Sequence, residues 1–258
     1  MLRSLVIAAV VFTPVASALA GPGLTLPKGK INVAVNAELE LSVDKVAKPL
    51  SLSPDVSYGI TDALTVALVH SRYATTGFRA AAGGGLCLTG TDGGCVAAYN
   101  NVGVEGWHRV PSGTLAVAAG GGLHATNLDA GFYAAKLGLK ARYTSGLLAV
   151  NALPSVLVAM TEREDATGAR LNQDTLWVPV QLTYRAVDAV TVGVGSGIKG
   201  PLSGFGDAWQ VPLGFMGLYA IDSALAVGAS FTFGQIVGGA DATGVDYRGA
   251  QAWVSYTM

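Results

Sequence analysis

Residues 219–233 read YAIDSALAVGASFTF and set the pattern for the whole chain. After a tight turn at Ile221-Asp222-Ser223, the apolar side chains take every second position: Leu225, Val227, Ala229, Phe231 and Phe233. The alternate positions hold small or polar residues: Ala226, Gly228, Ser230 and Thr232. Period 2 with two unlike faces predicts a β-strand that separates two environments.

Similar alternating runs extend from end to end and predict twelve strands. Their ranges are 30–42, 50–60, 64–73, 96–109, 114–126, 131–144, 147–160, 175–185, 190–198, 208–219, 225–233 and 247–258. A tilted membrane strand needs about 9–11 residues, which most of these runs satisfy. Tight turns follow every second strand, and mostly longer connections follow the others. The run 64–73 alternates poorly, so a ten-strand count stays open.

The composition agrees with membrane strands. Charged residues make up 13% of the chain, about half the usual share, and mean hydropathy is +0.46. Beyond the N-terminal region no run of about 18 apolar residues occurs, so no helix is expected to span a bilayer. Spreading apolar residues over alternate positions is what a transmembrane barrel requires. The net charge of −1 provides no basic field for nucleic acid.

The N-terminal residues have the pattern of an export signal. Arg3 precedes an apolar run, Leu5–Val11, and Ala18-Leu19-Ala20 forms an A-x-A cleavage site. We therefore expect a cleaved signal peptide at 1–20 and one barrel domain at 21–258. In an exported protein, Cys87 and Cys95 are expected to form a disulfide.

Tyrosines mark one edge of the predicted barrel. Tyr58, Tyr143, Tyr184 and Tyr219 each stand on the outward phase just before a short turn, and Tyr256 has the same phase. A phenol ring can bury its body in lipid and keep its hydroxyl wet, so these residues predict an interfacial girdle. Short turns are typical of the periplasmic end of outer-membrane barrels, and the longer loops of the external end.

The turns YGITDAL (58–64), YRAVDAV (184–190) and YAIDSAL (219–225), with the last strand AWVSYTM, resemble Gram-negative outer-membrane β-barrel proteins. They are similar to porin and solute-transport barrels. The resemblance implies an all-β, antiparallel up-and-down barrel located in the outer membrane, with membrane lipid as a partner. The last strand looks like the signal read by the barrel assembly machinery, although Met258 stands where Phe or Trp is usual.

Charged residues on the inward phase are the candidate pore lining. The acidic ones are Glu38, Glu40, Asp55 and Glu105, and the basic ones are Arg109, Lys136, Lys140, Arg142 and Arg185. Acidic and basic walls facing each other would set selectivity in a passive channel for small solutes. The alternative is a filled barrel, stabilised by ion pairs, that acts through its external loops.

Small inward residues favour the pore: Gly193, Gly195, Gly197, Ala226, Gly228 and Ser230. A barrel of more than eight strands has spare room inside. The connection 74–95 is the one loop long enough to resemble the inserted constriction loop of large porins.

A lipid-modifying enzyme is the third hypothesis. His124-Ala125-Thr126-Asn127 faintly resembles the His-x-Ser-Asn motif of outer-membrane phospholipase, also a twelve-stranded barrel. The hydroxyl here belongs to Thr, and the phase turns His124 inward rather than towards lipid, so catalysis is not expected. His70 and His108 have no partner at metal-ligand spacing, and neither metal nor cofactor is expected.

Overall fold

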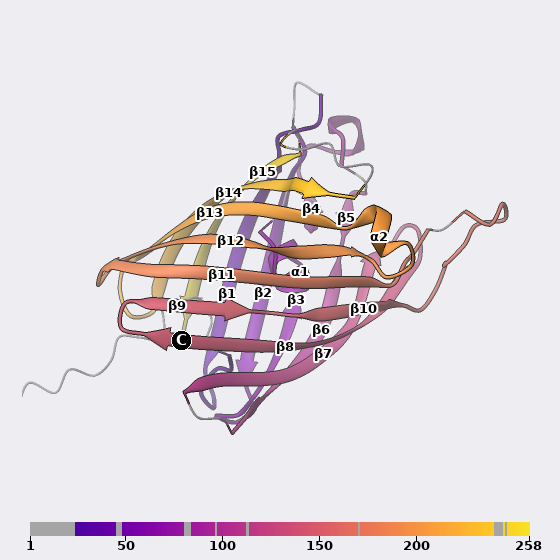
Figure 1. Ribbon diagram of the computed structural model, residues 1–258. Helices are drawn as coiled ribbons and strands as arrows, with labels where there is room; N and C mark the ends of the chain where they lie inside the picture. Colours follow the sequence, from indigo (N-terminus) through magenta and orange to yellow (C-terminus); the bar gives the residue numbers. More distant parts are fainter. Residues whose placement is uncertain are drawn as a thin grey trace, which may run out of the picture.

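The computed structural model describes residues 24–44, 48–79, 84–95, 97–111, 114–169, 171–239, 245 and 247–258. The expected signal peptide, and with it the boundary between residues 20 and 21, lies outside the described residues. Within them the chain forms a closed, antiparallel, up-and-down barrel of 12 strands, as the alternation predicted (Figure 1). The ring closes because β1 pairs with both β2 and β15.

The wall consists, in chain order, of β1 (Ile31–Glu40), β2 (Leu50–Gly59), β3 (Leu64–Val69), β6 (Val102–Val110), β7 (Leu115–Asn127), β8 (Phe132–Ser145), β9 (Leu148–Ala152) with β10 (Ser155–Ala159), β11 (Thr175–Val187), β12 (Val190–Pro201), β13 (Gln210–Ala220), β14 (Leu225–Gly238) and β15 (Arg248–Thr257). The remaining elements are α1 (Arg72–Thr76), β4 (Gly85–Cys87), η1 (Thr91–Gly93), β5 (Tyr99–Asn100) and α2 (Phe205–Ala208). Neither α1 nor α2, the α-helices of the described residues, is long and apolar enough to cross a membrane.

Burial in this barrel is the reverse of that in a water-soluble protein. Outward apolar side chains are exposed, with Leu137 at 66%, Leu182 at 49% and Phe215 at 48%. Inward polar side chains such as Asn36 and Gln181 are buried, with exposed fractions of 3% and 7%. An apolar surface of this extent requires an apolar solvent, which a bilayer supplies.

The predicted tyrosines lie exposed at a common end of the barrel, beside the short turns. We call this the turn end and the opposite one the loop end. Register places them opposite residues at strand termini: Tyr58 faces Ile31, Tyr143 faces Leu115, Tyr184 faces Leu148, Tyr219 faces Val190 and Tyr256 faces Leu225. Their exposed fractions are 44–51%.

Two strand predictions were wrong in their continuity. The run 147–160 is broken into β9 and β10 at Leu153-Pro154, because proline has no N–H to give to the sheet. The predicted strand 96–109 enters the wall only at Val102. Tyr99 and Asn100 pair instead with β4, which itself adds to the end of β2.

The third predicted strand was wrong at its end. It leaves the wall at Val69 rather than Tyr73, and the chain then turns into the barrel and forms α1 (Figure 1). The predicted loose connection 74–95 therefore contains the end of a helix, a short strand and a 3-10 turn. Cys87 and Cys95 form the predicted disulfide within it.

Candidate functional site

Residues 70–79, here called the lumen segment, occupy the interior of the barrel. The Ser71 hydroxyl begins α1 by accepting a hydrogen bond from the Ala74 N–H at 3.0 Å. Gly77 ends the helix with φ of 75°, and its N–H donates to the Tyr73 carbonyl. A serine cap and a glycine six residues later were local signals for this helix.

Asp55 fixes the start of the lumen segment. Its Oδ1 accepts the backbone N–H groups of His70 at 2.7 Å and Ser71 at 2.9 Å. Its Oδ2 accepts the Ser71 hydroxyl at 2.5 Å and the Asn36 amide at 3.1 Å. This carboxylate, a predicted pore-lining group, therefore has its hydrogen-bonding capacity taken up by the protein.

Glu38 is fully buried and has a similar role on the neighbouring strand β1. Its carboxylate accepts the backbone N–H of Arg72 at 2.9 Å and that of Gly84 at 3.2 Å. Asn101 holds the other side of the helix, because its amide nitrogen donates to the His70 carbonyl and the Thr75 hydroxyl, both at 2.7 Å. These contacts bind the lumen segment to β1, β2 and the residue that precedes β6.

Glu105 is the centre of a buried polar network. Lys136 Nζ lies 2.7 Å from Glu105 Oε1, and the Trp107 indole N–H donates to Oε2, also at 2.7 Å. Lys136 also donates to the carbonyl of Ala74 in α1 at 2.9 Å. This acidic and this basic side chain, expected on opposite walls, thus meet in one ion pair and support the helix.

His124 belongs to the same network. Its Nε2 lies 3.1 Å from Glu105 Oε1, and the residue is only 2% exposed. Its ring occupies the space over Gly103, where a Cβ would come within 2.2 Å of Nδ1. The Thr126 hydroxyl donates instead to the Phe132 carbonyl. The lipase hypothesis needs a histidine and a hydroxyl that are paired and face the lipid. His124 and Thr126 form no such pair.

The lumen segment contacts β15, the neighbour of β1, through Arg79, and β11, on the far side of the ring, through Tyr73. The Arg79 guanidinium stacks between the rings of Tyr73 and Trp253, at 4.0 and 3.7 Å from their centroids. Arg79 Nη1 donates to Gln251 at 3.3 Å, and the Tyr73 hydroxyl to Gln181 at 3.4 Å. The segment therefore contacts strands on both sides of the barrel.

The expected free space beside the inward glycines is largely filled. At Gly228 a Cβ would lie 2.1 Å from the Trp253 ring, and at Gly197 it would lie 2.1 Å from the Val178 carbonyl oxygen. Gly193 is tightly packed as well, whereas a Cβ at Gly195 would make an ordinary 3.5 Å contact. The expectation of open space was thus wrong for most of these positions, because glycine admits a neighbouring ring or backbone.

The remaining predicted lumen residues lie at different depths. Lys140 stacks on Trp107 at 4.3 Å, and Arg142 Nε donates to Asn151 at 2.7 Å. Arg185 is half-buried and Arg109 exposed, both on the inward phase near the turn end. Glu40 is buried at the loop end, where its Oε1 accepts the Ser42 N–H.

Three cations were missed by the sequence interpretation: Arg72, Arg79 and Lys199. Arg72 and Arg79 stand in the lumen segment, whose helix was not predicted. Lys199 follows Gly193, Gly195 and Gly197 on the inward phase of β12, so continuing the alternation by two residues would have found it.

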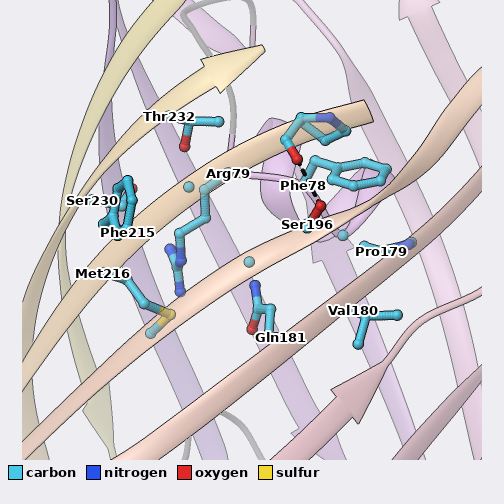
Figure 2. Close-up of a pocket in the computed structure, with 14 residues that line it drawn as sticks. Phe78, Arg79, Pro179, Val180, Gln181, Ser196, Phe215, Met216, Ser230 and Thr232 are labelled. Carbon is cyan, nitrogen blue, oxygen red and sulfur yellow. Dashed lines mark hydrogen bonds between the residues drawn. The ribbon is translucent and has the colours of Figure 1, made fainter. Parts of the chain in front are cut away.

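Two cavities adjoin the lumen segment. One of about 400 Å³ opens at the loop end and is lined by Glu40, Arg72, Tyr247 and the disulfide. The other, of about 20 Å³, lies between the lumen segment and the wall formed by β11 to β14 (Figure 2). Among the described residues, no three His, Cys, Asp or Glu side chains are grouped so as to hold a metal ion.

Comparison with solved structures finds the same barrel fold in known porins. The structure superposes on that of the NanC porin with a TM-score of 0.62 at 12% identity, over 87% of this chain and 98% of that chain. The chain has a porin fold. The KdgM porin gives a TM-score of 0.54 at 9% identity, with the same coverage of both chains. No protein-family model and no curated protein matches the sequence.

Proposed function

We propose that this protein is an outer-membrane channel of the porin type that passes small solutes and prefers anions. Residues 1–20 would direct its export, and the last strand would be read by the barrel assembly machinery. The fold and the apolar outer surface support this location. The single observation that carries the preference is the distribution of charge inside the barrel.

The inward carboxylates lie near the middle of the barrel or towards its loop end, and they have protein partners there. Asp55 and Glu38 bind the backbone of the lumen segment, and Glu105 binds Lys136. In the half towards the turn end, Arg109, Lys140 and Arg185 form no ion pair with a carboxylate among the described residues. A lumen lined by cations attracts anions and excludes cations.

A solved structure with the same fold offers a matching chemistry. One structure of KdgM, with a TM-score of 0.55 and 9% identity, is of that porin in complex with disordered oligogalacturonate, an acidic sugar chain. Small carboxylated solutes are therefore the first candidates for this chain.

Reversal potentials test the proposal. Refolded protein in planar bilayers under a KCl gradient should show a chloride-to-potassium permeability ratio above one. The double variant Arg109→Gln, Arg185→Gln should move this ratio towards one, while Arg163→Gln, in an external ion pair with Asp174, should leave it unchanged. A cation-selective reversal potential contradicts the proposal.

A second candidate is favoured by the lumen segment itself, which contacts both sides of the barrel. In that case the barrel is filled and acts through its surface loops. Absence of conductance at every voltage, from protein that is correctly folded, would select this candidate over the channel.

A further inference from the structure

The guanidinium of Arg79 is held in a fixed plane inside the barrel. Tyr73 covers one face and Trp253 the other, with centroid distances of 4.0 and 3.7 Å. Stacking on aromatic rings favours a cation but offers nothing to its N–H groups, which radiate from the edge of the plane. The partners of that edge therefore decide what else this side chain binds.

The N–H groups at the edge of the Arg79 guanidinium have few hydrogen-bond acceptors in the protein. Nη1 donates to Gln251 Oε1 at 3.3 Å, and Nε is buried with no hydrogen-bond partner. No carboxylate among the described residues forms an ion pair with Arg79. The four residues that follow it, Ala80 to Gly83, carry no acidic group in the sequence. The Glu38 carboxylate acts on Arg79 only from beyond ion-pair distance. A buried charge without a counter-charge in contact is costly.

Arg79 lines a cavity of about 20 Å³ together with Gln181, Met216, Ser230 and Thr232 among others (Figure 2). A volume near this size admits one water-sized particle. The Ser230 hydroxyl, on the same cavity, is likewise buried and has no hydrogen-bond partner. The cavity therefore offers a charged N–H donor and a hydroxyl donor that the protein leaves unused.

We infer that this cavity binds one small monovalent anion, of halide size, held by Arg79 and Ser230. A water molecule could accept both hydrogen bonds but would leave the guanidinium without a counter-charge in contact with it. A metal cation is repelled by Arg79. The inference concerns a resident ion and goes beyond the proposed transport of solutes. It holds whether or not the barrel conducts.

Bromide is the probe, because its anomalous scattering distinguishes it from water. Crystals of the full barrel grown in sodium bromide should show an anomalous peak between Arg79 and Ser230. Arg79→Met should abolish the peak and Ser230→Ala should lower its occupancy, whereas Arg185→Met, outside the cavity, should leave it unchanged. Excess sodium acetate should leave the bromide peak unchanged, because acetate is too large for a cavity that admits one water-sized particle, and displacement by acetate would contradict a site of halide size.

A wild-type crystal with no anomalous peak in the cavity overturns the inference, and so does a peak that persists in Arg79→Met. Should Arg79→Met fail to fold, an unchanged occupancy in Ser230→Ala overturns it instead. Because the peak is read from crystals, a cation-selective or non-conducting barrel that retains it would refute the proposed function and leave this site standing.

Discussion

Two walls of the lumen are built from the same alternating strands but meet different neighbours. The segment wall, formed by the inward faces of β1, β2, β6 and β8, presents Glu38, Asp55, Glu105 and Lys136 to the lumen segment. The glycine wall, formed by β12, β13 and β14, presents small residues, and the lumen segment reaches it through Arg79. The outer faces of both walls carry exposed apolar side chains, such as Val35 and Leu137 on the segment wall and Val194 and Phe215 on the glycine wall.

The difference shows that period 2 specifies the outer face of a barrel more fully than the inner one. Every outward residue meets the same solvent, so apolarity alone suffices there. An inward polar residue is stable only with a partner, and that partner comes from a distant part of the chain. The segment wall carries polar residues because it binds the lumen segment. The glycine wall carries small residues because aromatic rings and backbone pack against it.

The largest effect is expected from Glu105→Gln on the segment wall. Removing the carboxylate charge leaves Lys136 buried without its counter-charge, and breaking such a pair costs about 3–5 kcal/mol. Equilibrium urea unfolding in detergent micelles measures the loss. Gln181→Met on the opposite side removes one long hydrogen bond from Tyr73 and should cost about 0.5–1.5 kcal/mol. Equal losses would contradict the distinction between the two sides.

Asp55→Ala should free the lumen segment and raise single-channel conductance several-fold. The variant removes the acceptor of two backbone N–H groups and the Ser71 hydroxyl, so the start of α1 keeps only the hydrogen bond between the His70 ring and the Pro54 carbonyl as its side-chain attachment to β2. Ser196→Ala is the matched control on the glycine wall, because the Ser196 hydroxyl donates to the Pro212 carbonyl and not to the lumen segment. Unchanged conductance in Asp55→Ala, with the fold intact, would show that the segment does not restrict the lumen.

A pair of glycine substitutions tests packing on the glycine wall itself. Gly228→Ala places a methyl group 2.1 Å from the Trp253 ring and should cost about 1–3 kcal/mol through overpacking. Gly195→Ala makes an ordinary contact with Gln181 at 3.5 Å and should change stability by less than about 0.5 kcal/mol. Thermal unfolding of both variants decides whether the wall is packed or open, and a tolerated Gly228→Ala would mean that Trp253 can move aside.

The smallest effect is expected in the short turn that joins β13 to β14 at the turn end of the glycine wall. The Asp222 carboxylate accepts the N–H groups of Ala224 and Leu225 at 2.6 and 2.8 Å, and these bonds lower its pKa. A carboxylate whose pKa is lower in the folded state stabilises that state. This contribution to stability is present above the unfolded pKa, about 3.9, and is lost as pH falls through the folded pKa.

Asp222→Asn should therefore reduce the thermal midpoint slightly at pH 7, and by less at pH 3. Asp188→Asn, at the corresponding turn, is the control, because the Asp188 carboxylate accepts no backbone N–H among the described residues. A larger midpoint shift at pH 3 than at pH 7 would contradict the expected sign.

Strand number, outward faces and the tyrosine positions were readable from the sequence because each depends on local alternation. The lumen segment was not, although the poor pattern of 64–73 was a sign of it. That run fails to alternate because its last residues, from His70 onward, leave the wall. Its binding partners, Asp55 and Asn101, lie 15 or more positions away and bond to backbone groups, which leave no trace in side-chain periodicity.

For the same reason, the sequence predicts which charged residues point inward but not which of them pair. The inward phase of Glu105 and Lys136 follows from their strands, but their pairing depends on the register of β6, β7 and β8. Arg79 could not be placed at all, since its two stacking partners come from the lumen segment and the last strand.

The attachment of the lumen segment also bears on the order of assembly. Its anchors on the segment wall lie within 62 positions of it along the chain, whereas closure of the ring joins β1 to β15 across more than 200. Short loops close at lower entropic cost than long ones. We therefore expect the first half of the chain to gather around α1 as an open trough, with the helix already seated when the last strand arrives. The lumen segment would then be bound inside the barrel before β15 closes the ring, and no loop needs to be threaded through a closed barrel afterwards.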